Sequence, residues 1–200
     1  PSRGLGDVYK RQICKFDADI IFPTHYLETM ASSFSNDSNL GMFSGVLTTY
    51  LNGIWELENI STQHVRGPVK SYSKSCFHAI GGLRPALGWD TLDELLALYK
   101  GFTIKIDDTL RAKHLRPTGY RYSHRLAKAK GEVFYNLGYG LLLGTLACIK
   151  WAHLQRCSLV KVLFGFFGVW LKSKSKLVSK AEGKFIRTYR WSRIRSRFIG

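Results

Sequence analysis

The sequence feature that most constrains the fold is an apolar stretch at 13–22 that is interrupted by two aspartates. The residues ICKF are followed by Asp17-Ala18-Asp19 and then by IIF. In an extended strand, residues i and i+2 point to the same side, so the two carboxylates would face the same way. Hard divalent cations prefer carboxylate oxygens and share them with substrate phosphates. The pattern predicts a metal-diphosphate site, and an acidic turn that caps the strand is the alternative interpretation.

Helical and extended patterns alternate after this stretch, which is typical of an α/β domain. The residues that follow the strand predict a helix at 23–34. A second helix, at 74–80, would end at Gly81-Gly82. Strand patterns cover 40–50, 54–60, 69–72, 102–106 and 110–115.

A third predicted helix begins at Asp90 and ends at Gly101. Asp90 suits the N-cap, and Asp93 and Glu94 would complement the helix dipole in the first turn. Leucines at helical spacing would form its buried face. A helix cap alone contributes about 1 kcal/mol, and this structural role is the alternative to a chemical one for Asp90.

Taken in order, these segments resemble family two glycosyltransferases of the GT-A fold, in particular bacterial members with a Trp-Asp-Thr-x-Asp-Glu helix start. The resemblance covers about residues 13–119. It is carried by Asp17-Ala18-Asp19, Gly81-Gly82-Leu83, Gly88-Trp89-Asp90-Thr91-Leu92-Asp93-Glu94, Gly101-Phe102 and His114-Leu115-Arg116-Pro117-Thr118-Gly119. The order and spacing of the motifs together are more specific than any one of them.

The resemblance implies inverting transfer of a sugar from a nucleotide-sugar donor to a glycan or lipid-linked acceptor. Asp19 would bind Mg²⁺ or Mn²⁺ under the donor diphosphate, and Asp17 would lie near the ribose or the metal. Asp90 would be the general base, which removes the acceptor proton as the anomeric carbon is attacked. The metal would neutralise charge on the departing diphosphate.

The same resemblance suggests roles for residues around Asp90. Trp89 stands where the family usually has Glu, which favours Asp90 as the base and weakens an accessory role for Asp93 and Glu94. All three neighbours are assigned to the acceptor side. Trp89 could stack on a sugar ring or fill a core.

Two further pairs of residues have both a functional and a structural interpretation. Gly81 and Gly82 either end a helix or allow an acceptor-side loop to approach closely. His114 and Arg116 follow a predicted strand and could contact the donor diphosphate, because imidazole and guanidinium both suit anions. The alternative for His114 is a purely structural role.

Positive charge is concentrated after residue 124. Residues 125–200 hold 16 Lys and Arg but two acidic residues, in a chain of net charge +16. The charge-free run at 133–149 is at the lower limit for a membrane-spanning helix, and the run at 159–171 contains Lys161. If the run at 133–149 crossed the membrane, the lysines and arginines on its two flanks would lie on opposite sides, against the tendency of cations to gather on the cytoplasmic side.

We therefore expect a helical tail at 125–200 that lies as an interfacial hairpin on the cytoplasmic face of the bacterial inner membrane. Its cations would face anionic lipid. Aromatic side chains would lie at headgroup depth: Tyr135, Tyr139, Trp151 and Trp170. Packing of the helical pair on the catalytic domain is the alternative.

Two other functions remain as alternatives. A basic nucleic-acid-binding module would use the arginines at 187–197 and the aromatic residues between them. That function leaves the acidic residues at 17–19 and 90–94 unexplained, so no nucleic-acid partner is expected. A non-catalytic, membrane-associated relic is the third possibility.

The beginning of the chain does not match a complete GT-A domain. Residues 1–12 carry no structural pattern, and we expect them to be a non-native leader. A GT-A domain normally opens with a nucleotide-binding βαβ half ahead of its Asp-x-Asp, and twelve residues are too few for one crossover. Residues 13–124 are thus expected to be a partial GT-A domain, which leaves activity of the isolated chain open.

Overall fold

The computed structural model describes residues 12–58, 64–116 and 126–199, with side chains up to residue 196. The chain divides into two compact units. The first comprises Pro1–Pro85 and Trp89–Thr118, and the second comprises Ala86–Gly88 and Gly119–Gly200. Gln12 is the one residue of the expected leader that is described, and it begins the first strand.

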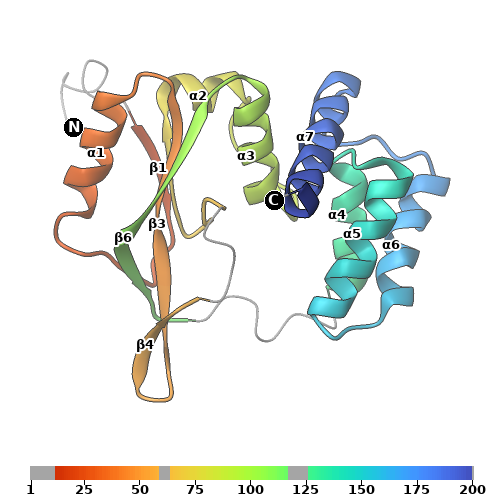
Figure 1. Cartoon of the computed structure of the whole chain (residues 1–200), viewed down its shortest axis with the longest axis horizontal. Helices are drawn as coiled ribbons and strands as arrows, with labels where there is room; N and C mark the ends of the chain where they lie inside the picture. The colour runs from red at the N-terminus through yellow and green to blue at the C-terminus, as the bar shows by residue number, and fades with distance from the viewer. Residues whose placement is uncertain (1–11, 59–63, 117–125, 200) are drawn as a thin grey trace, which may run out of the picture. The chain divides into compact units, whose positions relative to one another are not determined.

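The first unit contains a mixed sheet, which confirms the α/β class (Figure 1). Its strand order is β1-β5-β3-β6-β2, and β4 pairs with the end of β3. The pairing of β3 with β6 is parallel, and the other pairings are antiparallel. The strands are β1 (Gln12–Phe16), β2 (Ile20–Ile21), β3 (Leu40–Leu51), β4 (Ile54–Leu57), β5 (Val69–Ser73) and β6 (Thr103–His114).

The centre of this unit is β3, whose first ten residues are all buried. Such a continuous buried run is typical of a strand that is covered on both faces. Helix α1 (Tyr26–Asn36) places Tyr26, Met30 and Phe34 at helical spacing in a core cluster with Phe43 of β3. The Tyr26 hydroxyl accepts a hydrogen bond from Gly45 N–H at 2.9 Å and donates one to the Val69 carbonyl at 3.1 Å. One buried side chain therefore links α1, β3 and β5.

Two further helices precede β6 in the chain. Helix α2 (Lys74–Ala79) is capped by Ser73, whose hydroxyl accepts from Cys76 N–H at 3.2 Å. The helix ends where predicted, because Gly81 and Gly82 adopt positive φ angles of 79° and 72°. Helix α3 (Trp89–Tyr99) begins one residue earlier than predicted. Asp90 thus lies in the first turn and is not the N-cap residue.

The prediction of two strands at 102–106 and 110–115 was wrong, because β6 runs unbroken from Thr103 to His114. The polar residues between the two predicted strands are accommodated by an irregularity in the pairing of β6 with β3. The register jumps from Gly45↔Asp107 to Val46↔Arg111. Asp107 accepts hydrogen bonds from the backbone and hydroxyl of Thr109, at 3.1 and 2.6 Å, which satisfies polar groups at this point.

The second unit is helical in its described part. Its helices are α4 (Ala127–Asn136), α5 (Gly140–Leu154), α6 (Leu159–Leu171) and α7 (Lys180–Ile199). The charge-free run at 133–149 is not one helix, because Gly138 and Gly140 have positive φ angles of 70° and 71° between α4 and α5. No helix in the described ranges is long and apolar enough to cross a membrane.

Helices α4 and α6 approach each other through two glycines. A Cβ at Gly131 would lie 2.0 Å from the Val162 carbonyl oxygen, and one at Gly165 would lie 1.9 Å from the Lys128 carbonyl oxygen. No side chain fits in either place without a backbone shift. The absence of a side chain at these positions therefore sets the distance between the two helices.

We predict opposite effects for two substitutions in α6. Gly165→Ala should destabilise the chain by on the order of 1–3 kcal/mol, since the new methyl meets backbone. Gly168→Ala should stabilise it by about 0.5–1 kcal/mol, because open space surrounds this position and Ala is the better helix former. Urea unfolding of both variants measures the difference. Equal effects of the same sign would contradict the close packing of α4 on α6.

Candidate functional site

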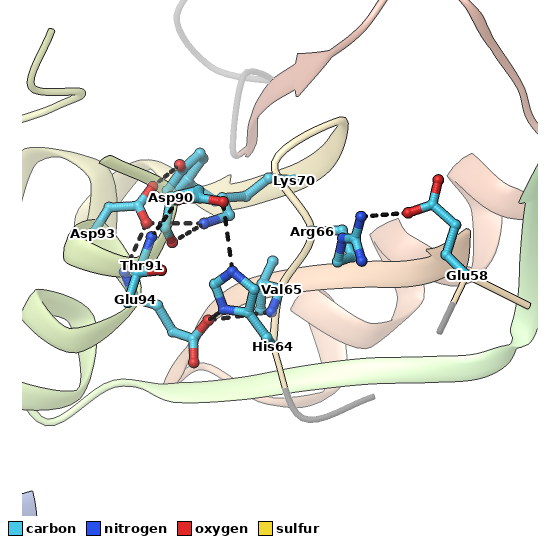
Figure 2. Close-up of polar contacts among 10 residues, drawn as sticks. Glu58, His64, Val65, Arg66, Lys70, Asp90, Thr91, Asp93 and Glu94 are labelled. Atoms are coloured by element: carbon cyan, nitrogen blue, oxygen red, sulfur yellow. Dashed lines mark hydrogen bonds and ion pairs between the residues drawn. The ribbon is translucent and has the colours of Figure 1, made fainter. Parts of the chain in front are cut away.

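Three acidic side chains gather at the start of α3, each held by a partner from elsewhere in the first unit (Figure 2). Lys70 of β5 lies 2.8 Å from Asp93 Oδ1 and 2.6 Å from the Asp90 carbonyl oxygen. The Tyr72 hydroxyl donates to the other carboxylate oxygen of Asp93. Lys70, Tyr72 and Asp93 are all buried. This network attaches the first turn of α3 to β5.

Burial has the largest effect on the pKa values of Asp93 and Tyr72 in this network. Burial raises the pKa of Asp93, and the neighbouring Lys70 ammonium opposes that shift. Burial and the charge of Asp93 raise the pKa of the Tyr72 hydroxyl far above its usual range. Tyr72 therefore remains a hydrogen-bond donor at all working pH values. Asp93 is buried. Its assignment to the acceptor side stays a prediction.

His64 joins the other two acidic residues of α3. Its Nδ1 pairs with Glu94 Oε2, and its Nε2 lies 3.6 Å from Asp90 Oδ2. Glu94 also accepts a hydrogen bond from Val65 N–H at 3.2 Å. Burial disfavours a charged imidazole, but the hydrogen bonds with Asp90 and Glu94 outweigh it and raise the pKa of His64 to about 9. His64 is therefore an imidazolium that bridges two carboxylates at neutral pH.

Asp90 is ionised and accessible. Burial opposes its charge, but His64 more than compensates and lowers the pKa of Asp90 to about 2. Its side chain is 38% exposed, so a carboxylate oxygen can be reached from solvent. Thr91 N–H donates to Asp90 Oδ1 at 2.9 Å and fixes the carboxylate from behind. The arrangement offers a negatively charged proton acceptor at a fixed position.

A second acidic centre lies where β2 pairs with β6. Ile20 pairs with His114, and Leu115 N–H donates to the Asp19 carbonyl at 3.0 Å, which brings Asp19 beside His114. His114 Nε2 lies 3.9 Å from Asp19 Oδ1, and its Nδ1 lies 2.7 Å from Glu58 Oε1. Arg66 pairs with the other oxygen of Glu58. The imidazole is thus oriented by a carboxylate that is itself held by a guanidinium.

Imidazole nitrogens and carboxylate oxygens are both ligand types for divalent cations. An imidazole nitrogen and a carboxylate oxygen converge, and the other ring nitrogen bonds to a second carboxylate, as is usual for histidines that ligate metals. Within the described ranges, no group of three or more His, Cys, Asp or Glu could hold a metal. Two protein ligands suffice where substrate phosphates complete the coordination, as they commonly do for Mg²⁺.

Asp17 has a different environment from Asp19. It lies directly after β1 and pairs with Lys15, whose ammonium is 5.3 Å from the centre of the Trp89 ring. Lys70, the register partner of Lys15, lies at the same distance from that ring. Trp89 therefore interacts with two ammonium groups.

The segment 64–70 connects the two acidic centres. His64 and Lys70 bind the start of α3, while Arg66 holds the Glu58 that orients His114. A Cβ at Gly67 would lie 3.5 Å from the Trp89 ring, and the Pro68 carbonyl accepts from Asp17 N–H at 2.9 Å. Asp17, Trp89 and Asp90 thus contact this stretch of chain, and Asp19 is linked to it through His114, Glu58 and Arg66.

The remaining predicted site residues lie outside these contacts. Gly81 and Gly82 end α2, as one of their two interpretations holds. Arg116 is exposed directly after β6 and forms no hydrogen bond or ion pair with the described residues. The motif residues Pro117, Thr118 and Gly119 lie outside the described ranges.

Sequence patterns alone did not mark the residues that hold this site together: Glu58, His64, Arg66, Lys70 and Tyr72. One signal was present, because Lys70 is a single charge inside the otherwise uncharged strand pattern VKSY. A lone charge in a buried strand requires a partner. Nothing local marks Glu58 or His64.

Comparisons with known proteins give a likeness of structure but none of sequence. No protein-family profile and no curated protein match the sequence. The fold is similar to the crystal structure of GalNAc-T7 with UDP, GalNAc and Mn²⁺, with a TM-score of 0.45 and 12% identity. The match covers 82% of this chain and 41% of that one, so the chain spans about two fifths of its length. A likeness at this level assigns neither family nor activity.

The charge of His64 gives a testable titration. We predict that its imidazole stays protonated until about pH 9 and that Asp90→Asn or Glu94→Gln lowers that pKa, since each removes a stabilising charge. Glu56→Gln, an exposed strand residue, is the matched control and should leave it unchanged. NMR titration of the ring protons measures all four proteins.

The same shifts fix the sign of the pH dependence of stability. The folded-state pKa of His64 lies above its ordinary 6.5, so its contribution is complete below about pH 6.5 and is lost as pH rises through 9. The contribution of Asp90 is present above 3.8 and is lost as pH falls towards 2. A His64 pKa near 6.5 in the unaltered protein would contradict the first statement, and an Asp90 pKa near 3.8 would contradict the second.

Proposed function

We propose that this chain is part of a metal-dependent glycosyltransferase that uses a nucleotide-sugar donor. The proposal rests on one observation, namely that a single short segment, residues 64–70, supports two candidate centres. A cation-type centre at Asp19 and His114 and an ionised carboxylate at Asp90 are both held by residues 64–70. The resemblance of the sequence motifs to family two GT-A enzymes agrees with this arrangement.

At the donor end, Asp19 and His114 would hold Mg²⁺ or Mn²⁺. The cation would supply charge neutralisation for the diphosphate. Glu58 fixes the imidazole through Nδ1 and so sets the direction of Nε2 towards Asp19. Arg66 holds Glu58 in turn. We place Asp17 near the ribose or the metal, and Arg116 near the diphosphate.

At the acceptor end, Asp90 would be the general base. The acceptor hydroxyl oxygen bonds to the anomeric carbon, the bond from that carbon to the diphosphate breaks, and the hydroxyl proton moves to the Asp90 carboxylate. Attack from the face opposite the leaving group inverts the configuration. A carboxylate with a pKa of about 2 is a weak base, so the proton transfers late, as the acidity of the attacking oxygen rises.

Residues beside Asp90 would shape the acceptor side. In this proposal Trp89 presents an aromatic face next to the base, and Glu94 anchors His64 against it. Gly81 and Gly82, which end α2, would also lie on the side of a glycan or lipid-linked acceptor. Residues 13–124 would form the GT-A domain, and residues 125–200 would bring it to anionic lipid on the cytoplasmic face of a bacterial inner membrane.

Nucleic acid is the less favoured partner because two of its predicted binding residues, Arg187 and Arg190, have partners within the second unit. Arg187 donates to the Gly138 carbonyl at 2.7 Å, and the Arg190 guanidinium lies 5.9 Å from the centre of the Tyr139 ring. These arginines hold α7 against the turn between α4 and α5.

We predict metal-dependent nucleotide binding that requires the Asp19 centre. UDP or GDP should bind in the presence of Mn²⁺ and not in EDTA, and Asp19→Asn or His114→Gln should weaken binding by about tenfold or more, since each removes a ligand. Asp108→Asn, an exposed acid on β6, is the charge-matched control. Isothermal titration calorimetry measures binding, and circular dichroism verifies folding. Equal binding by all variants would contradict the metal centre.

A separate prediction concerns Asp90. Asp90→Asn should retain Mn²⁺-dependent nucleotide binding but reduce sugar transfer by about 10²-fold or more, because the proton acceptor is lost. Release of UDP from a panel of UDP-sugars with added acceptors measures transfer. Wild-type turnover by the variant would exclude Asp90 as the base without affecting the metal centre.

A further inference from the structure

The outer face of α6 is an uninterrupted apolar stripe. Val160, Phe164 and Leu171 recur at helical spacing and are 76%, 65% and 74% exposed. The position between Phe164 and Leu171 is Gly168, which has open space around it. Val162, Gly165, Phe166 and Val169 face the interior of the unit. Helix α6 is therefore apolar on its inner face and also on the outer face that is exposed to solvent.

Helix α5 carries a similar stripe. Leu142, Leu146 and Ile149 lie on one side of the helix and are exposed, while Gly144 packs against the ring of Phe166 on the other side. Helices α5 and α6 are joined by a short turn and pack against each other (Figure 1). Soluble surfaces rarely expose this many large apolar side chains in neighbouring rows without a partner.

Cations surround the stripe of α6. Lys161 is exposed on the flank of the helix, and Lys172 and Lys174 are exposed directly after it. The Lys128 ammonium lies 5.4 Å from the centre of the Phe164 ring. A hollow of about 340 Å³ at the C-terminal end is lined by Tyr135, Trp170, Leu171, Ser173 and Lys176. Indole and ammonium groups are those that favour the lipid headgroup region.

We propose that the outer faces of α5 and α6 insert into the interfacial region of an anionic bilayer, with α6 parallel to the membrane plane. The proposal deepens the membrane association proposed above by naming the surface. An apolar stripe flanked by lysines is the pattern of helices that lie in the interface. The docking residues differ from those expected from sequence, because Tyr135 and Tyr139 are buried.

Charge distinguishes this occupant from a second copy of the chain. Residues 125–200 contain 16 Lys and Arg and two Glu, so two copies meeting through these faces would bring strongly positive units together. Anionic lipid offers the complementary charge and an apolar phase for the stripe.

The test compares the binding of two triple variants of the full chain to vesicles. Wild type should bind phosphatidylcholine vesicles that contain about a third phosphatidylglycerol and should bind neutral vesicles more weakly. Val160→Ser/Phe164→Ser/Leu171→Ser should reduce binding by about tenfold or more, since the apolar surface is lost. The matched control, Leu51→Ser/Ile54→Ser/Leu57→Ser, removes three exposed apolar residues from the hairpin of β3 and β4 and should bind like wild type.

Flotation without donor or acceptor measures binding, so the result is independent of glycosyl transfer. Asp90→Asn should float like wild type. Unchanged binding by the α6 variant, an equal loss in the control, or failure of wild type to bind anionic vesicles would overturn the proposal. So would a wild-type dimer in sedimentation velocity that the α6 variant dissociates, because the stripe would then be a contact between copies.

Discussion

The candidate site depends on the buried ion pair between Lys70 and Asp93. Each charge is costly to bury, and each is compensated by the other, by the Tyr72 hydroxyl and by the Asp90 carbonyl. Loss of either partner would leave an uncompensated charge in the interior. The pair fixes the first turn of α3 on β5, and that position brings Asp90 and Glu94 within reach of His64.

The second centre is built on the same segment of chain. Arg66 lies between His64 and Lys70 in sequence, and through Glu58 it determines the orientation of His114. A change in the path of residues 64–70 would therefore move Asp90 and His114 together. Such coupling suits a reaction in which one carboxylate acts on the acceptor while a cation acts on the leaving group.

The two units differ in how they use charge. In the first unit, cations and carboxylates are matched and held in defined pairs around the site. In the second, glycines bring α4 and α6 together, while lysines stay exposed beside apolar stripes. The first pattern positions chemical groups, and the second leaves an exposed apolar surface flanked by cations.

The sequence by itself determined the alternation of helices and strands in the first unit and the end of α2 at Gly81-Gly82, because periodicity and glycine act locally. It also marked Asp19 and Asp90 as candidates. Only the tertiary structure decided what holds them. Lys70 and Asp93 are 23 residues apart, and Glu58 and His114 are 56 apart. Such pairs follow from sheet register and from the path of a loop between strands, and no local pattern encodes either. The same holds for the stripe on α6, since the apolar residues that pack inward and those that face solvent are distinguished only by the position of α4.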